Sequence, residues 1–362
     1  MSVSYGGDSI TFADGSVNSS GFIGHRNRII NGAMVIDQRN AGVSVTPTDQ
    51  SYTLDRWSQF LSQSSKLTIQ QNAGSVTPPA GFTNYLGVTS TSAYSITSSD
   101  YFNLYQYIEG FNVADLNWGT ANAKTVTLSF WVRSSLTGTF GGSLMNSTPN
   151  RSYPFTYTIS SANTWEQKSI TVAGDTSGTW LTTNGIGLRV LFGLGMGSNL
   201  TGPAGAWAGA AYYGASGATS VVGTNGATFY ITGVQLERGS TASSFEYRSY
   251  QKELMLCQRY YCKSYNIGTA PATENKPGAL FTYQVSNNAA WNARFPVTMR
   301  TAATVTPYDM SGNANQCTFS TTNAATGINS QFPGESGCLI YSSAGSGKAA
   351  DVYVHFVASA EL

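Results

Sequence analysis

The chain has 362 residues, of which 41% are hydrophobic and only 10% are charged, and its formal net charge is +1. This length allows one large core or two ordinary ones, and so small a charge gives no field that would steer the chain to DNA or to an anionic membrane. The sequence has no Lys/Arg cluster for phosphate, no long apolar run, and no signal-peptide pattern in Met1–Asp8, so we expect no nucleic-acid partner, no membrane insertion and a mature chain that begins here.

The N-terminal residues contain the segment ITFADGSV, in which Asp14-Gly15 predicts a turn after a short strand. Because residues 1–24 are too few to bury a core of their own, we predict that they form an attachment arm. The next segment is HRNRIINGAMVIDQRNAG, where apolar residues flank Asn31-Gly32. This pattern predicts a strand with a turn or bulge, and Asp37 could pair with Arg39.

Short apolar alternations then recur between clusters of Gly, Ser, Thr, Asn and Pro, without a helical period of useful length. The segments that predict strands are LDRWSQFL, SKLTIQQ, NYLGVTS, DYFNLYQYIEG, KTVTLSFWVRSS, YPFTYTIS, TWEQKSITVAG, IGLRVLFGLG and ATFYITGVQL. In KTVTLSFWVRS the inward face is predicted to hold Val126, Leu128, Phe130 and Val132. Strands of this number and length predict an all-β fold with two packed antiparallel sheets, a β-sandwich or jelly roll, over residues 25–248.

A long stretch inside this range has a different composition. Gly193–Gly226 is so rich in Gly, Ala and Ser that we predict a long loop, with Trp207, Tyr212 and Tyr213 as its large anchors. Loops of this length in compact domains usually serve a function or are covered by a partner, so this one is a candidate contact surface.

The alternation ends at SYQKELMLCQRYYCKSY, where we predict a short helical connector over residues 249–265, capped by Ser249 and with Glu253 in an exposed first turn. The residues with the spacing of its apolar stripe are Tyr250, Leu254, Cys257 and Tyr261. Strand patterns then resume in ALFTYQVS, ARFPVTM, ATVTPYDM, CTFSTTN, GCLIYSS and KAADVYVHFVAS. Residues 266–362 are therefore predicted to form a second, smaller β-sandwich.

The four cysteines lack the two-residue spacing of a zinc site, so we expect buried free thiols and no metal or cofactor, while a bridge between Cys317 and Cys338 stays open. The two histidines, His25 and His355, have no Ser or Cys in a recognisable nucleophile setting.

The densest acidic group is Asp100, Glu109 and Asp115, which we interpret as solvated charges rather than as a pair for glycoside hydrolysis. We therefore predict no catalytic residue and no enzyme.

Two groups of segments resemble known families. LSFWVRSSLTGTF, TWEQKSITVAGDTSGTW and ATFYITGVQLERG, in that order, resemble the carbohydrate-binding-module type of jelly roll. NRIINGAMVIDQRNAG with VQLERGSTASSFEYRSYQKELMLCQRYY is similar to a group of bacteriophage tail-fibre and related virion proteins, and ITFADGSV resembles the fibre motif ahead of such domains. The resemblance implies a homotrimeric virion protein that joins phage tail or capsid proteins through its N-terminal arm.

The aromatic residues carry the predicted recognition. Seven Trp and 21 Tyr exceed what a core of this size requires, and stacking on an aromatic face would hold a neutral host polysaccharide. The candidate ligand-binding residues are Trp131, Tyr101, Tyr105, Tyr107, Trp207, Tyr212 and Tyr213. The competing interpretation is that these rings pack between subunits.

The sequence thus predicts a tail fibre or receptor-binding protein. A capsid decoration or head-fibre protein is one alternative. A secreted carbohydrate-binding protein is another, against which the missing signal-peptide pattern counts.

Overall fold

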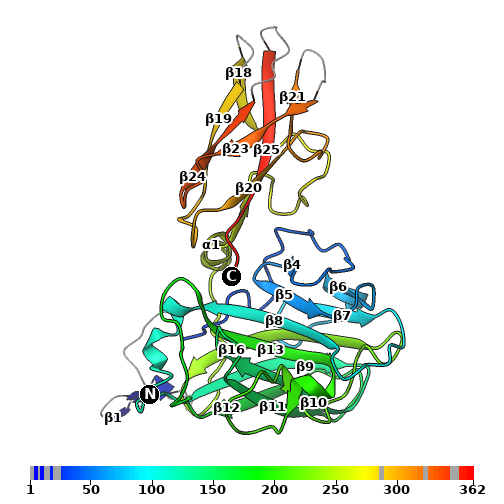
Figure 1. The fold of residues 1–362 in the computed structure, drawn as a ribbon, viewed down its shortest axis with the longest axis vertical. Helices are drawn as coiled ribbons and strands as arrows, with labels where there is room; N and C mark the ends of the chain where they lie inside the picture. Colours follow the sequence, from blue (N-terminus) through cyan, green and yellow to red (C-terminus); the bar gives the residue numbers. More distant parts are fainter. Residues whose placement is uncertain are drawn as a thin grey trace. The chain divides into compact units, whose positions relative to one another are not determined.

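The computed structural model describes strands in the N-terminal arm and then residues 26–284, 289–320, 325–342 and 350–362. It divides into two compact units, drawn in Figure 1. The first unit comprises Met1–Val35, Ser44–Ser51 and Trp57–Arg248, and the second comprises Ile36–Val43, Tyr52–Arg56 and Ser249–Leu362. Two short pieces of the range predicted for the first sandwich thus belong to the second unit.

The described part of the arm is a small antiparallel sheet of β1 (Ser4–Gly6), β2 (Ser9–Thr11) and β3 (Val17–Asn18). Strands β2 and β3 flank the predicted Asp14-Gly15 turn. That turn, like His25, lies outside the described residues.

The core of the first unit lies between two antiparallel sheets. Within the unit, one sheet has the order β11 (Ser152–Ile159), β10 (Gly138–Met145), β13 (Ile186–Met196), β8 (Tyr101–Glu109), β5 (Trp57–Leu61). The other has the order β12 (Glu166–Val172), β9 (Val126–Ser134), β16 (Thr228–Arg238), β7 (Leu86–Ser90), β6 (Leu67–Gln71). Two such layers form a jelly-roll β-sandwich, and the predicted fold class is confirmed.

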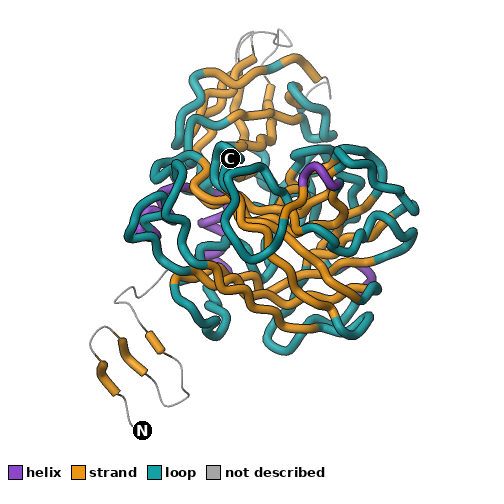
Figure 2. The backbone as a smooth tube through the Cα atoms, turned by 60° about the horizontal axis from the view of Figure 1, so that its bottom comes forward, coloured by secondary structure: helices purple, strands orange, loops and turns teal. Residues whose placement is uncertain are grey.

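Each of the nine predicted strand segments contains an observed strand, and Figure 2 shows these strands in orange between long teal loops. The alternation along β9 is also confirmed, because Val126, Leu128, Phe130 and Val132 are fully buried. The prediction missed β10, whose sequence GTFGGSLM is too rich in glycine to show a strand pattern. Glycine is required there, since a Cβ on Gly142 would lie 2.1 Å from the carbonyl oxygen of Leu191.

Short elements complete the first unit. They are η1 (Ala73–Ser75), η2 (Gly110–Asn112), η3 (Ala114–Leu116), η4 (Ser198–Leu200), β14 (Thr201–Gly202) and β15 (Gly214–Ala215). The last three interrupt the stretch predicted as a long loop, and residues 193–196 of that stretch continue β13, so the predicted loop begins four residues too early.

The strand predicted around Asn31-Gly32 is wrong, although the turn is present, with the Met34 amide donating to the Asn31 carbonyl at 3.1 Å. This segment bonds to β16 instead. The Asn27 side chain donates to the Val234 carbonyl at 3.0 Å and accepts from the Leu236 amide at 3.0 Å. The segment that begins at Asn27 is thus hydrogen-bonded to the segment that begins at Val234, the two stretches quoted above for their resemblance to virion proteins.

The predicted connector contains a shorter helix, α1 (Tyr250–Gln258), whose N-cap is Ser249 as predicted. Its buried residues include Leu254 and Cys257, as predicted, but the stripe is wrong at Tyr250, which is exposed, and the exposed first turn is wrong at Glu253, which is buried. The chain then enters β17 (Tyr261–Lys263), which pairs with the last strand. The helix ends at Gln258, before the predicted end, because Tyr261 lies in a strand that pairs with the last strand.

The second unit is organised around β25 (Ala350–Ser359), at the C-terminal end of the chain (red in Figure 1). Its partners are β17, β18 (Leu280–Gln284), β20 (Thr304–Tyr308) and β21 (Gln316–Phe319), and β21 also pairs with β22 (Ala325–Gly327). A second sheet has the order β19 (Ala289–Arg294), β24 (Gly337–Ser342), β23 (Asn329–Gln331). The strand predicted at ARFPVTM is therefore displaced, since β19 ends before Phe295-Pro296.

All four cysteines lie buried in this unit as free thiols, as expected, so that the bridge between Cys317 and Cys338 is not formed.

Residues from the early part of the chain complete the second unit, among them β4 (Tyr52–Leu54). Arg39 does not pair with Asp37 but with Glu361, at 2.6 Å, and Arg56 binds the other oxygen of the same carboxylate. The Arg56 guanidinium also lies over the ring of Tyr260, 3.6 Å from its centroid. One carboxylate therefore holds two arginines that have little contact with water.

Candidate ligand-binding surfaces

Four of the candidate rings gather on the outer face of β8. The two-residue period of the strand turns Phe102 and Leu104 to the core and the rings of Tyr101, Tyr105 and Tyr107 outward. They surround Phe60 of β5, which stacks on Tyr105 with ring centroids 4.4 Å apart and meets the edge of Tyr213 at 6.0 Å. The sequence analysis missed Phe60; its alternation with Trp57 and Leu61 in LDRWSQFL was the available signal.

Two of these rings are covered. Tyr105 and Tyr107 are only 2% and 5% exposed. The Arg189 guanidinium lies over Tyr107, 4.9 Å from the ring centroid, and donates to its hydroxyl at 3.2 Å. Burial raises the pKa of Tyr107, so this hydroxyl stays neutral. A sugar ring could stack on Tyr105 or Tyr107 only if the covering chain moved away.

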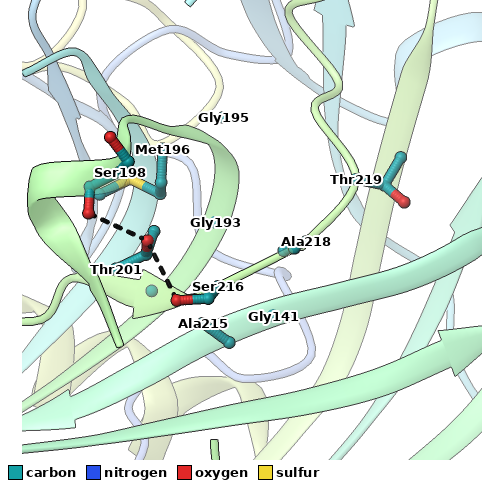
Figure 3. Close-up of a pocket in the computed structure, with 12 residues that line it drawn as sticks. Gly141, Gly193, Gly195, Met196, Ser198, Thr201, Ala215, Ser216, Ala218 and Thr219 are labelled. Atoms are coloured by element: carbon teal, nitrogen blue, oxygen red, sulfur yellow. Dashed lines mark hydrogen bonds between the residues drawn. The ribbon is translucent and has the colours of Figure 1, made fainter. Parts of the chain in front are cut away.

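The covering chain is the glycine-rich loop. Asn103, on the outer face of β8, donates to the Tyr213 carbonyl at 3.4 Å, and Ser152 of β11 donates to the Ala210 carbonyl at 2.7 Å. Beneath the loop lies a cleft of about 380 Å³, shown in Figure 3, whose floor is formed in part by Gly141 and Gly193.

The cleft offers hydroxyl groups but no ring and no charge. Its walls include Ser198, Thr201, Ser216 and Thr219. The Thr201 hydroxyl donates to the Ser198 carbonyl at 3.4 Å and accepts from Ser216 at 3.3 Å, the two dashed lines of Figure 3. Such long bonds are easily exchanged, so the cleft could hydrogen-bond an uncharged polar molecule, but it could not stack on one.

The other two loop aromatics serve packing in this structure. Trp207 meets Trp118 and Trp180 edge to face at 5.3 and 5.4 Å, and its indole N–H donates to the Ala173 carbonyl at 2.7 Å. Tyr212 lies against Gly202, where a Cβ would come within 2.2 Å of its ring. Both anchor the loop as predicted, and each leaves part of its ring exposed.

Trp131 belongs to a separate surface, which we call the aromatic patch: Phe82, Trp131, Phe245 and Tyr247. Phe82 lies 5.1 Å from Phe245 and 5.6 Å from Tyr247, measured between ring centroids. A Cβ on Gly233 would lie 2.6 Å from the Phe82 ring and 3.1 Å from the Trp131 ring, so the patch is continuous because Gly233 has no side chain. Tyr247 is 60% exposed.

The acidic residues do not form a catalytic pair. Asp100 and Glu109 lie at opposite ends of β8, roughly 30 Å apart at the rise of an extended strand. Although burial alone would raise it, hydrogen bonds from Thr97, Ser62 and Tyr94 lower the pKa of Asp100 to about 2. Asp115 pairs with Arg28 at 2.8 Å. Asp100 and Glu109 are buried, so the interpretation of this group as solvated charges is wrong for these two residues.

His355 is buried in the second unit. Its ring stacks on Tyr265, 3.8 Å between centroids, and its nitrogens bond to the Ser264 hydroxyl and the Asn275 carbonyl. Burial lowers the pKa of His355, although the bond to Asn275 opposes the shift. The neutral imidazole therefore fills a structural role.

Within the described residues, His, Cys, Asp and Glu side chains do not gather in the groups of three or more that could hold a metal ion. Over the same residues, no helix has the length and apolar character needed to span a membrane.

No protein-family model and no curated protein matches the sequence. Several solved structures match 55–59% of the chain at 11–15% identity. A putative sugar binding protein from Bacteroides thetaiotaomicron is 13% identical with a TM-score of 0.34, matched over 59% of this chain and 100% of its own. A family 61 carbohydrate-binding module in complex with β-1,4-galactotriose is 12% identical with a TM-score of 0.30, over 59% and 99%.

The enzymatically active domain of tailspike protein 4 of bacteriophage CBA120 is also 12% identical, with a TM-score of 0.32 over 59% of this chain. The chain spans about a fifth of that tailspike, 21% of its length. At these scores none of the three likenesses assigns a ligand to this chain.

Proposed function

We propose that this protein is a glycan-binding component of a bacteriophage virion, a tail fibre or receptor-binding protein that contacts host surface polysaccharide through the aromatic patch. The observation that carries the proposal is the cluster of four neighbouring rings, Tyr247 exposed and the other three half-buried, on a chain with very few charges. The resemblance of the Asn27–Gly42 and Val234–Tyr261 segments to virion proteins supports the phage origin.

The physical basis is ring stacking. Covering a water-exposed aromatic ring with an apolar surface lowers the free energy of the system. The C–H face of a sugar provides such a surface while the sugar hydroxyls stay hydrated. Recognition of this kind needs no charge and no bond-breaking residue, so the proposal includes no hydrolysis. The N-terminal arm would attach the protein to the tail or capsid, and three copies would associate.

The test is binding of the full chain to an array of neutral and acidic bacterial surface glycans. We expect Tyr247→Ala and Trp131→Ala to weaken glycan binding about tenfold each. The matched control is Phe111→Ala, because Phe111 is also 60% exposed but lies outside the patch. Equal binding by all three variants would contradict the proposal.

Mass photometry of the same variants separates stacking on a glycan from packing between copies. If wild type binds no glycan while Trp131→Ala dissociates an oligomer, the patch is a subunit contact. A monomer in wild type would count against the trimer. Antibody labelling of intact particles would then distinguish tail from capsid attachment.

A further inference from the structure

The second unit carries a groove between β19 and the turn that joins β23 to β24. Alternation along β19 buries Trp291 and Ala293 and exposes Asn292 and Arg294. These exposed side chains line a groove of about 520 Å³ together with Phe332 and others from the turn between β23 and β24. The groove is wide open to solvent, so it could hold one face of a ligand rather than enclose it.

Phe332 is held in an unfavourable state in two respects. Its side chain is 82% exposed, the largest exposure among the large hydrophobic residues described. Its φ of 51° is left-handed, a conformation that bulky L-residues rarely adopt. Neither feature helps the fold, and residues kept in such a conformation often serve a function.

The turn that presents Phe332 is nevertheless well fixed. The Gly334 amide donates to the Gly337 carbonyl at 2.9 Å, and the Met299 amide donates to the Glu335 carbonyl at 2.8 Å. A Cβ on Gly337 would lie 2.4 Å from the Ala293 carbonyl oxygen, so glycine lets this end of β24 approach β19 closely. The ring is therefore presented by a backbone that is already ordered, which lowers the entropy lost on binding.

The polar side chains around the ring are available. Asn292, Arg294 and Glu335 all line the groove, and none of their side chains bonds to another residue in the described ranges. An arginine can only donate hydrogen bonds, a carboxylate can only accept them, and an asparagine can do both. Neighbouring hydroxyl groups on one ligand, each both donor and acceptor, match this set.

We propose that this groove is a second glycan-binding site, independent of the aromatic patch, and that its ligand is an uncharged saccharide. Phe332 would stack on the sugar face, while Asn292, Arg294 and Glu335 bond to its hydroxyls. The charges of Arg294 and Glu335 oppose each other, so an anionic ligand attracted by one is repelled by the other. The groove therefore favours a neutral glycan over an acidic one.

The experiment uses the full chain with Trp131→Ala, in which binding at the aromatic patch is expected to be about tenfold weaker, on the same glycan array. We expect this protein to retain binding to a neutral glycan and Phe332→Gly to weaken that binding about tenfold. Phe281→Ala is the matched control, since Phe281 is 57% exposed in the same unit but lies outside the groove. It should leave binding unchanged.

Stability provides the second readout. Glycine accepts a φ of 51° without strain, so Phe332→Gly should leave the urea midpoint of the second unit unchanged or raised. A lower midpoint would mean that the ring is structural and would overturn the proposal. Three other results would also overturn the proposal: binding that Phe332→Gly does not weaken, binding only to acidic glycans, and a complete loss of binding in Trp131→Ala. Failure of the aromatic patch alone would instead show as unchanged binding in Trp131→Ala.

Discussion

Replacing Glu361 by glutamine should strongly destabilise the second unit. The side chains of Arg56 and Glu361 are 1% and 9% exposed, and each oxygen of the carboxylate binds a different arginine, Arg39 or Arg56. Glutamine keeps the shape but removes the negative charge to which both guanidinium groups are bound. Loss of one partner from a buried ion pair costs about 3–5 kcal/mol, and we expect a loss of that size in the free energy of unfolding.

The cysteines provide an assay that reports on this unit alone. All four thiols of the chain are buried in it, so pulsed thiol labelling across a urea series follows its unfolding and ignores the first unit. With a urea slope of about 2 kcal/mol/M, the midpoint should fall by roughly 2 M. The control is Glu274→Gln, because Glu274 is exposed. A shift below about 0.3 M in Glu361→Gln would refute the view that this carboxylate neutralises the arginines.

Three further outcomes test other parts of the structure. Burial, opposed by Arg39 and by hydrogen bonds from Gln38, raises the pKa of Asp55 to about 6, so the folded state holds this proton more tightly than the unfolded chain does. The urea midpoint of wild type should therefore decrease as the pH rises from 4 to 6, relative to that of Asp55→Asn. Midpoints of the two proteins that change in parallel with pH would disprove the shift. Among the described residues the buried Tyr157 hydroxyl has no hydrogen-bond partner, so Tyr157→Phe should stabilise the first unit by about 1 kcal/mol in calorimetry, whereas a loss of stability would mean that the hydroxyl does form a bond. Gly142→Ala should cost more than 3 kcal/mol or prevent folding, unlike Gly209→Ala, whose Cβ meets nothing closer than 3.8 Å.

Most of the fold could be predicted from local sequence patterns. Nine of the ten strands in the two sheets of the first unit could be predicted, because packing of one face on the core imposes a two-residue period that neighbouring residues reveal. The helix cap at Ser249 could also be predicted, because it too is local: the Ser249 hydroxyl accepts from the amide of Lys252, three residues later. It failed at β10, where contacts with distant strands, not neighbours, require Gly142.

The candidate site was less predictable, because exposure is not a local property. Periodicity correctly turned Tyr105 and Tyr107 away from the core, but it could not show that a loop starting some ninety residues later covers them. Phe332 had no distinguishing pattern in its own segment, since its exposure and left-handed backbone arise from a turn fixed by residues of other elements.

The sequence by itself thus determined an all-β chain with two sandwiches, a low charge and an excess of aromatic rings. Only the tertiary structure decided which rings reach solvent. It also decided that Arg39 and Arg56 both form ion pairs with Glu361, which lies far from them along the chain. The physical reason is the range of the interactions: strand formation reflects neighbouring residues, whereas burial, stacking and ion pairing reflect whatever the fold brings alongside.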